Sequence, residues 1–222
     1  MAKDMRIISG LLKGRQLSFP TDIRPTQNKV RKAVFDCLAQ AVEGAEFLEL
    51  FAGSGAVGIE AISCGAKRVT FVDSDFNSLK VIESNLKRLE INDRHYRIVK
   101  SDVFKYLDYS ADQKAVVWHP ISQRAMVRLP IAAAIAKATG GKTGFDIIFI
   151  DPPYRQAQAK NCLLRITACD ILNLSGILVI EHHKKEDLPR QACLTGRQEG
   201  SLMLFKQKAY SDTRLSFYRA GL

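Results

Sequence analysis

The chain has 222 residues, of which 46% are hydrophobic and 25% charged, so it can form one well-covered core but is too short for two full domains. Its 33 lysine and arginine residues exceed its 23 acidic residues, and the net charge of +10 favours a polyanionic partner such as RNA or DNA. No apolar run approaches the about 20 residues of a bilayer-spanning helix, no signal peptide is visible and the cysteines lack C-x-x-C spacing, so we expect a cytoplasmic protein with no membrane contact and no metal site.

Residues 1–43 are predicted to form a basic extension of the main domain. Two short apolar stretches, at 6–8 and 16–19, flank a glycine-bounded turn, which predicts a β-hairpin. Thr26 suits the N-cap of a helix that ends near Ala41, because apolar residues recur there at helical spacing. Basic residues outnumber acidic ones throughout this segment, so we expect it to contact nucleic-acid phosphates. The candidate substrate-binding residues in it are Arg6, Lys13, Arg15, Arg24 and Thr26.

After Gly44 the pattern changes to buried strands that alternate with helices, which predicts an α/β domain over residues 44–222 with a mostly parallel sheet. Two further β-like runs, 201–205 and 214–218, have no helical pattern between them. They predict an antiparallel pair at one sheet edge. The remaining predicted strands are 47–51, 68–72, 96–100, 146–150 and 177–181, and the predicted helices are 56–64, 76–90 and 156–171.

The connection at about 109–143 is too long for an ordinary loop and interrupts the alternation. Its core contains no acidic residue, and the segment LPIAAAIAKA has helical composition. We expect a partly ordered basic insertion, which either is a plain surface loop or binds substrate. Its basic residues are Lys114, Arg124, Arg128, Lys137 and Lys142.

The segment from Glu49 to Gly55 ends a buried strand and opens a helix, so its glycines lie where the backbone must turn sharply beside a ligand. This loop predicts a cofactor site. Gly53 to Gly58 also match G-x-G-x-x-G, and Asp73 follows about 20 residues on, so a dinucleotide is a competing cofactor. The candidate cofactor-binding residues are Glu49, Phe51, Ala52, Gly53, Gly55, Asp73 and Asp102.

Three acidic residues distinguish the two cofactors only in part. A carboxylate at Asp73 can accept hydrogen bonds from both hydroxyls of a ribose, which either cofactor contains. An acid at Glu49 suits the ammonium of a methionine moiety and repels a pyrophosphate. Asp102 is placed to accept from an adenine amino group, although it equally suits the N-cap of a short helix.

The residues Asp151, Pro152, Pro153 and Tyr154 directly follow a predicted buried strand, and we identify them as the candidate catalytic site. Buried strands of open α/β sheets carry ligand sites at their carboxyl ends. An exocyclic base amine is a poor nucleophile, and acceptors from Asp151 and a proline carbonyl can hold its two N–H groups. Tyr154 offers a face on which the base stacks. Arg155 is a further candidate substrate-binding residue.

At this point the sequence resembles the RsmD family of 16S ribosomal RNA guanine-N2 methyltransferases. The resemblance covers most of the chain except the insertion. The matching segments, in chain order, are MRIISGLLKGRQL, RPTQNKVRKAVFDCL, FLELFAGSGAVGIEAISCGA, VTFVDSD, SDVF, FDIIFIDPPY, ILVIEHHKKEDLP and YSDTRLSFY.

The resemblance implies a Rossmann-like methyltransferase fold, S-adenosyl-L-methionine as cofactor, and the cofactor and catalytic roles given above. It also implies 16S ribosomal RNA as the partner, within a small-subunit particle or an assembly intermediate. Glu49 and Asp73 stand where the family more often has aspartate and glutamate, and Ser211 replaces a usual glycine.

Three alternatives to guanine-N2 methylation remain open at this point. Asp-Pro-Pro-Tyr can hold any exocyclic amine, so N6-adenine methylation of RNA or DNA is one. A nicotinamide-dependent oxidoreductase is favoured by the G-x-G-x-x-G match and opposed by Glu49 and by Asp-Pro-Pro-Tyr. A catalytically idle RNA-binding assembly factor is compatible with the basic extension.

Overall fold

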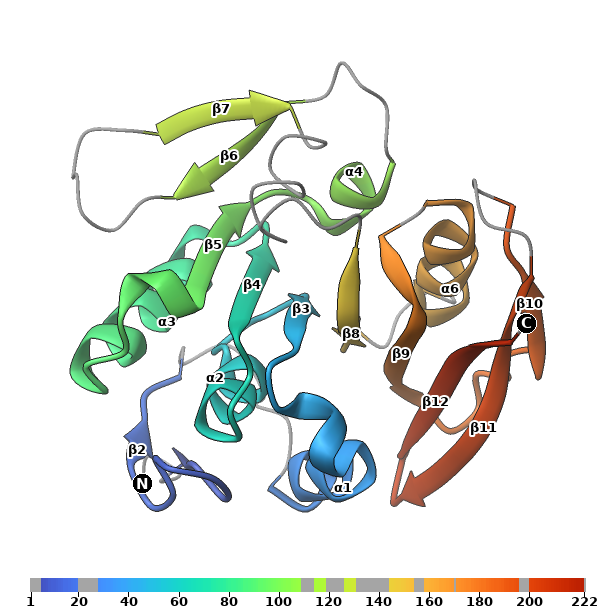
Figure 1. Cartoon of the computed structure of the whole chain (residues 1–222), viewed down its shortest axis with the longest axis horizontal. Coiled ribbons are helices and arrows are strands. Elements are labelled where there is room, and N and C mark those ends of the chain that lie inside the picture. Colours follow the sequence, from blue (N-terminus) through green and yellow to red (C-terminus); the bar gives the residue numbers. More distant parts are fainter. Residues whose placement is uncertain are drawn as a thin grey trace.

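A computed structural model describes residues 5–19, 28–108, 114–118, 126–130, 144–153, 158–169, 171–195 and 200–221. A ten-stranded sheet forms the centre of the molecule, and a small hairpin forms a second, two-stranded sheet (Figure 1). No helix among the described residues is both long and apolar enough to cross a lipid bilayer.

The elements follow one another in the order that the sequence predicts, with a few additions. The strands are β1 (Met5–Arg6), β2 (Gln16–Leu17), β3 (Glu46–Leu50), β4 (Arg68–Asp73), β5 (Tyr96–Lys100), β6 (Lys114–Trp118), β7 (Met126–Pro130), β8 (Phe145–Ile150), β9 (Leu172–His183), β10 (Gln191–Cys193), β11 (Ser201–Tyr210) and β12 (Thr213–Gly221). The helices are α1 (Asn28–Leu38), α2 (Ala56–Ser63), α3 (Phe76–Arg88), α4 (Val103–Leu107) and α6 (Gln158–Ala168), with 3-10 turns η1 (Ala39–Val42) and η2 (Asp93–His95).

The central strands β9, β8, β3, β4 and β5 lie in this order and run parallel. The chain first builds β3, β4 and β5 in one direction and then places β8 on the other side of β3. Ligands bind at such a reversal, beyond the carboxyl ends of the strands. Leu50 is paired with both Val72 and Ile150, so the loops after β3, β4 and β8 emerge at the same edge of the sheet.

Antiparallel strands extend the sheet on both sides. At one edge β12, β11 and β10 continue from β9, which confirms the predicted C-terminal pair and adds the short strand β10. At the other edge β6 and β7, both from the basic insertion, pair antiparallel with β5 and with each other. The helical composition of LPIAAAIAKA falls mostly on residues 131–138, outside the described part of the chain.

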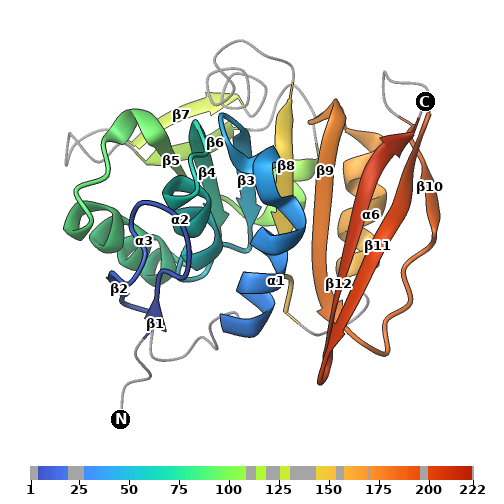
Figure 2. The same cartoon turned by 60° about the horizontal axis from the view of Figure 1, so that its bottom comes forward.

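Two hydrophobic clusters cover the two faces of the sheet. One contains the apolar sides of α1, α2 and α3, and the other those of α4 and α6. Met5, Ile7 and Leu17 of the N-terminal hairpin belong to the first cluster. The hairpin therefore packs against the main α/β domain, beside α2 and α3 (Figure 2).

Candidate functional site

The loop between β3 and α2 has an unusual backbone. Phe51, Gly53 and Gly55 all have positive φ values, of 56°, 51° and 71°. Glycine adopts this conformation at little cost, whereas Phe51 does so at a cost of the order of 1 to 2 kcal/mol. A Cβ atom at Gly55 would also lie 2.9 Å from Cγ1 of Ile82. These glycines are required by the turn and by the close packing of α3.

Glu49 is 3% exposed and closes the start of α2 from the neighbouring strand. The N-cap of this helix is Gly55, which has no side chain to accept a hydrogen bond. Instead, the amide of Gly58 donates to Oε2 of Glu49 at 2.9 Å. A Cβ atom at Gly58 would lie 2.6 Å from that oxygen. A carboxylate thus occupies the helix start, where a dinucleotide pyrophosphate would otherwise bind.

The charge of Glu49 responds to the other acids of the site. Burial raises the pKa of its carboxyl group to about 8, although the amides of Gly58 and Val57 oppose this rise, and the negative charges of Asp151 and Asp73 add to it. Asp151 and Asp73 therefore lie near Glu49 at the carboxyl edge of the sheet. Among the described residues, no group of three His, Cys, Asp or Glu side chains is arranged to hold a metal ion.

Asp73, at the end of β4, holds the glycine loop. The amide of Gly53 donates to Oδ2 of Asp73 at 2.8 Å, and the amide of Asp75 donates to Oδ1 at 2.8 Å. Burial raises the pKa of Asp73 despite these two bonds. Each carboxylate oxygen has a further lone pair, so the carboxylate can still accept from a ribose.

Asp102 is the N-cap of α4, as one of its two predicted roles requires. The amide of Lys105 donates to Oδ1 of Asp102 at 3.0 Å. The same helix presents the ring of Phe104, whose centre lies 6.1 Å from that of Phe51 in an edge-to-face arrangement. Sequence reasoning missed this aromatic pair, because nothing local links a residue of the glycine loop to one in α4.

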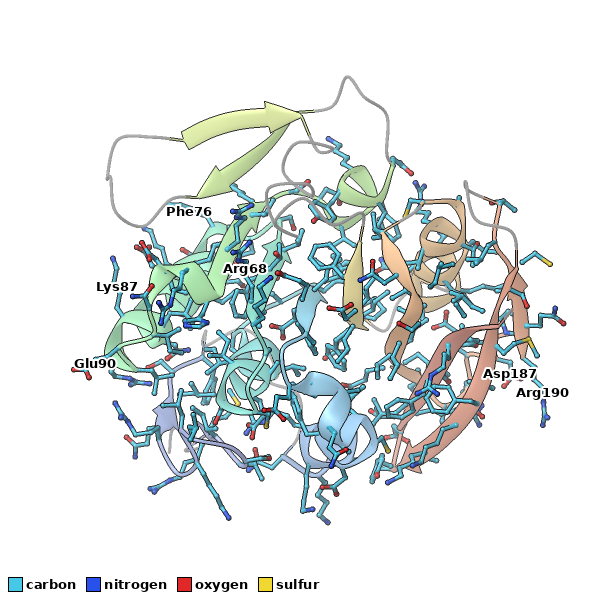
Figure 3. All side chains as sticks on the ribbon, in the orientation of Figure 1. Arg68, Phe76, Lys87, Glu90, Asp187 and Arg190 are labelled. Carbon is cyan, nitrogen blue, oxygen red and sulfur yellow. The ribbon has the colours of Figure 1, made fainter. Side chains whose placement is uncertain are left out.

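Phe76, at the start of α3, is a second aromatic residue that sequence reasoning missed. The ammonium groups of Lys80 and Lys100 lie 4.5 Å and 5.2 Å from the centre of its ring. Figure 3 shows Phe76 at one end of α3 and Lys87 at the opposite end. Phe76 follows Asp73 by three residues, so it lies beside the carboxyl end of β4, where the cofactor is expected.

Asp151 directly follows β8, at the reversal point of the sheet. It is half-buried, Pro152 is buried and Pro153 is exposed. Its neighbour Ile150 pairs with Leu50 of β3, which ends one residue before the glycine loop begins. The structure therefore brings the candidate catalytic acid to the candidate cofactor loop. Four predicted site residues lie outside the described residues, namely Arg24, Thr26, Tyr154 and Arg155.

Arg6, Lys13 and Arg15 are exposed on the N-terminal hairpin. Strands β1 and β2 pair antiparallel, as the sequence predicts. Nη2 of Arg15 donates to the carbonyl of Arg88 in α3 at 3.3 Å. The amide of Leu11 donates to the carbonyl of Ser63 at 2.8 Å, which docks the hairpin turn on the end of α2. These basic side chains thus belong to a surface over α2 and α3.

Comparisons with known proteins agree with this arrangement. A family model described as conserved hypothetical protein 95 matches residues 5–120 and 121–219, and the break between the two matches falls within the basic insertion. The chain is 32% identical over 217 residues to YlbH of Bacillus subtilis (strain 168), provisionally named an rRNA methyltransferase, covering 97% of this chain and 98% of YlbH. It is 30% identical over 184 residues to the ribosomal RNA small subunit methyltransferase D of Buchnera aphidicola subsp. Acyrthosiphon pisum, covering 82% and 80% of the two chains.

A solved structure has the same architecture. It is the provisionally named methyltransferase yhhF of Escherichia coli, which superimposes with a TM-score of 0.70 at 24% identity and covers 98% of both chains. This similarity confirms the predicted Rossmann-like methyltransferase fold. Together with Glu49 at the start of α2, the methyltransferase relatives favour methyl transfer over the nicotinamide chemistry that the G-x-G-x-x-G match left open.

Proposed function

Because the chain belongs to the RsmD family of ribosomal RNA methyltransferases, we propose that it transfers a methyl group from S-adenosylmethionine to the exocyclic N2 amine of a guanine in 16S ribosomal RNA. The observation that carries this proposal is the position of Asp151. Asp151 follows Ile150, which pairs with Leu50 next to Glu49, so the proposed acceptor for the target amine lies near the proposed acceptor for the cofactor.

The cofactor roles follow from the acceptors that the site presents. Glu49 binds the ammonium of the methionine moiety, because an ionised carboxylate at a buried position gains most from a cationic partner. Asp73 binds the ribose hydroxyls with lone pairs not used by the amides of Gly53 and Asp75. Asp102 accepts from the adenine amino group through Oδ2, since Oδ1 caps α4.

The bound cofactor supplies an electrophilic methyl group on its sulfonium. Asp151 accepts one N–H of the target amine and a carbonyl of Pro152 or Pro153 accepts the other, which draws the nitrogen towards tetrahedral geometry. The carboxylate of Asp151 also stabilises the positive charge that develops on nitrogen during transfer. Positioning accounts for most of the acceleration, and the proton released afterwards passes to Asp151 or to water.

The substrate contacts remain those expected from the sequence. Tyr154 stacks on the base, Arg155 with Arg24 and Thr26 contacts the adjoining RNA, and the exposed Arg6, Lys13 and Arg15 bind phosphates. A cytoplasmic ribosomal particle, a small subunit or its assembly intermediate, is the proposed partner. The N-terminal hairpin is docked on α2 and α3, whereas Asp151 follows β8, so a substrate that contacts both must be large.

Substitution of Asp151 tests the catalytic role. Asp151→Ala should retain the fold and bind cofactor within a few-fold of the wild type, yet lose most of its turnover, because its contribution grows in the transition state. Asp151→Asn keeps an acceptor oxygen, so its residual rate should exceed that of the alanine variant. Single-turnover transfer with pre-bound cofactor and RNA isolates the chemical step. A wild-type rate in Asp151→Ala would favour the idle RNA-binding alternative.

The target base requires a separate experiment. Tritiated methyl groups are transferred to small subunits and to naked ribosomal RNA, both from cells that lack the modification, and the product nucleosides are then separated. We expect N2-methylguanosine in 16S ribosomal RNA. N6-methyladenosine would establish the alternative base specificity at the same site.

A further inference from the structure

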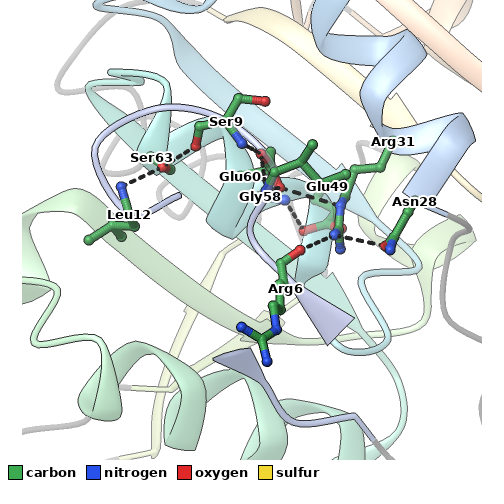
Figure 4. A network of polar contacts seen from close by, with 10 residues as sticks. Arg6, Ser9, Leu12, Asn28, Arg31, Glu49, Gly58, Glu60 and Ser63 are labelled. Carbon is green, nitrogen blue, oxygen red and sulfur yellow. Dashed lines mark hydrogen bonds and ion pairs between the residues drawn. The ribbon is translucent and has the colours of Figure 1, made fainter. Parts of the chain in front are cut away.

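Arg31 is a fully buried arginine of α1 that links three segments of the chain. Its Nε lies 3.3 Å from Oε2 of Glu60 in α2, and both side chains are 0% exposed. Its Nη2 donates to the carbonyl of Arg6 in β1 and, at 3.2 Å, to Oδ1 of Asn28. Figure 4 shows the guanidinium among these groups, with Glu49 beside it.

Glu60 is shared between Arg31 and the N-terminal hairpin. The amide of Ile8 donates to both of its carboxylate oxygens, at 2.9 Å and 3.0 Å. The amide of Ser9 donates to Oε1 at 2.5 Å. The buried ion pair is therefore satisfied on its acidic side by backbone amides, which fixes the place of the guanidinium under the hairpin (Figure 4).

The same guanidinium lies within the electrostatic influence of the cofactor loop. Burial lowers the pKa of Arg31, whereas the negative charges of Glu60 and Glu49 raise it. Glu60 follows Gly58 by two residues in α2, and the amide of Gly58 is bonded to Glu49. Helix α2 thus contacts Arg31 through Glu60 and Glu49 through Gly58.

The charges around Glu49 are mostly negative, so the positive charge of Arg31 opposes them. Asp73, at the end of β4, and Asp151, directly after β8, both act on Glu49, whereas Glu60 of α2 acts on Arg31. Arg31 comes from α1 and places a cation beside these acids. A guanidinium does not lose its proton in proteins, so it provides a permanent positive charge against the three acids.

Stability alone does not explain a buried pair of this kind. Replacing a buried ion pair by apolar residues of similar volume is often neutral or stabilising. Nη1 of Arg31 is moreover buried with no hydrogen-bond acceptor among the described residues, a further cost of placing an arginine here. A role in the adjacent cofactor site gives a reason for an arginine at a buried position where an apolar side chain could pack.

We propose that Arg31 is a positioning residue for the reaction: held by Glu60, Asn28 and the Arg6 carbonyl, it places a positive charge beside Glu49 and so favours the ionised carboxylate that binds the ammonium of the cofactor. This inference rests on the proposed function, which assigns the ammonium to Glu49. Arg31 acts on the cofactor only through Glu49.

The test compares the dissociation constant of S-adenosylmethionine for the wild type and for Arg31→Met between pH 6.5 and 9, by isothermal titration calorimetry on the full chain. Loss of the cation raises the pKa of Glu49, and one unit lowers its ionised fraction about tenfold at pH values below the pKa. We expect a Kd ratio of variant to wild type of about ten at pH 6.5, falling to about two or less at pH 9. The ratio cancels the titration of the cofactor's own amine.

Two further variants separate this role from a structural one. Arg31→Lys retains the cation and should keep the ratio within about twofold at both pH values, even where its melting temperature falls. If Arg31→Met does not fold, the double variant Arg31→Met with Glu60→Gln leaves no unpaired buried charge, and its amide oxygen still accepts from Ile8 and Ser9. The same decline of the ratio with pH, reduced in size, is expected. A ratio that is equal at pH 6.5 and 9 would overturn the inference.

Glu49→Gln distinguishes failure of this inference from failure of the proposed function. The proposed function requires weaker cofactor binding in Glu49→Gln at pH 8, by about tenfold or more. If that loss occurs while the ratio for Arg31→Met shows no pH trend, the positioning role fails and the proposed function stands. If Glu49→Gln binds normally, the ammonium assignment fails, and the role of Arg31 fails with it.

Discussion

Glu49 caps a helix, for which it needs only an acceptor oxygen, and is proposed to bind a cation, for which it needs a negative charge. It caps α2 by accepting from the amide of Gly58, a hydrogen bond that a neutral amide oxygen can also accept. When it is ionised, it is also a buried negative charge beside Asp73 and Asp151, which destabilises the empty protein and is relieved by a cation. Ionised Glu49 therefore lowers the unfolding free energy of the empty protein, and the proposed cationic ligand would remove this penalty when it binds.

This cost predicts a pH-dependent gain in stability for Glu49→Gln. The pKa of Glu49 is about 8 in the folded protein and near 4.5 in the unfolded chain, so between these values the folded state binds more protons. Its contribution to stability is fully present below pH 4.5 and is lost as the pH rises to about 8. The variant should therefore melt near the wild-type temperature at pH 5 and above it at pH 9, by a margin of a few kcal/mol in unfolding free energy. Thermal melting across this range, without cofactor, is the measurement, and a pH-independent difference would contradict it.

Ser211 stands where the family usually has glycine, and its backbone conformation explains that preference. It begins the two-residue turn between β11 and β12, where Tyr210 pairs with Thr213. Its φ is 52°, in the left-handed region that favours glycine. The glycine that is usual at this position in the family thus has a backbone reason.

We expect Ser211→Gly to stabilise the protein modestly. The left-handed conformation costs a non-glycine residue about 1 to 2 kcal/mol, and the added flexibility of glycine in the unfolded chain offsets about half of that. The melting temperature should rise by about 1 to 4 °C, with methyl transfer unchanged. Asp212→Gly is the matched control, because it removes the ion pair with Lys184 at a position without positive φ. It should lower the melting temperature.

At the scale of elements, strands and helices with a strong local pattern were predicted well and short edge strands were not. Helix α3 was expected at 76–90 and spans Phe76–Arg88, and its Asp75 cap accepts from the amides of Asn77 and Ser78. The three-residue strand β10 was missed because three residues carry too little alternation to be recognised. The pairing of β6 and β7 was also missed. These strands form because the edge of β5 is available for pairing, and their own sequences carry no clear strand pattern.

The candidate site shows the same division. Its loops were predicted because each combines turn residues with a preceding buried strand, as Asp151 and Pro152 do. Phe51 and Phe104 were not predicted to meet, because their contact depends on how α4 packs over the glycine loop. For Asp102 the sequence leaves two alternative roles, adenine binding and helix capping, and the capping role is confirmed. The roles in binding cofactor and substrate stay predictions.

At the scale of the whole molecule, acidic and basic residues gather in different places. Acids gather at the carboxyl edge of the parallel strands, whereas the exposed basic residues of the N-terminal hairpin lie over α2 and α3. A polyanionic substrate would be held by the hairpin and would meet repulsion at the site itself. Its target base must therefore be delivered by contacts made elsewhere on the RNA.

This arrangement predicts the salt dependence of RNA binding. Lys13→Ala combined with Arg15→Ala should flatten the plot of log affinity against log salt by about one unit for each phosphate that is no longer neutralised. Cofactor affinity should be unchanged, because neither residue touches the cofactor loop. Lys184→Ala is the control and should leave the slope unaltered, because Lys184 follows β9 and pairs with Asp212 in the turn between β11 and β12. Equal slopes in the double variant and the wild type would remove the N-terminal hairpin from the RNA interface.

The sequence by itself determined the order of the elements, the position of the glycine loop and the placement of Asp151 after a buried strand. These features depend on interactions between neighbours in the chain, such as alternation, turn residues and caps. Only the tertiary structure decided that Glu49 caps α2, that Glu60 binds the amides of Ile8 and Ser9, and that Arg31 lies between the N-terminal hairpin and the cofactor loop. A buried charge has no periodic signature, and its partners are chosen by the packing of segments that lie up to about 50 residues apart in the chain. For this reason the contacts that set the charge of the site became visible only in the folded molecule.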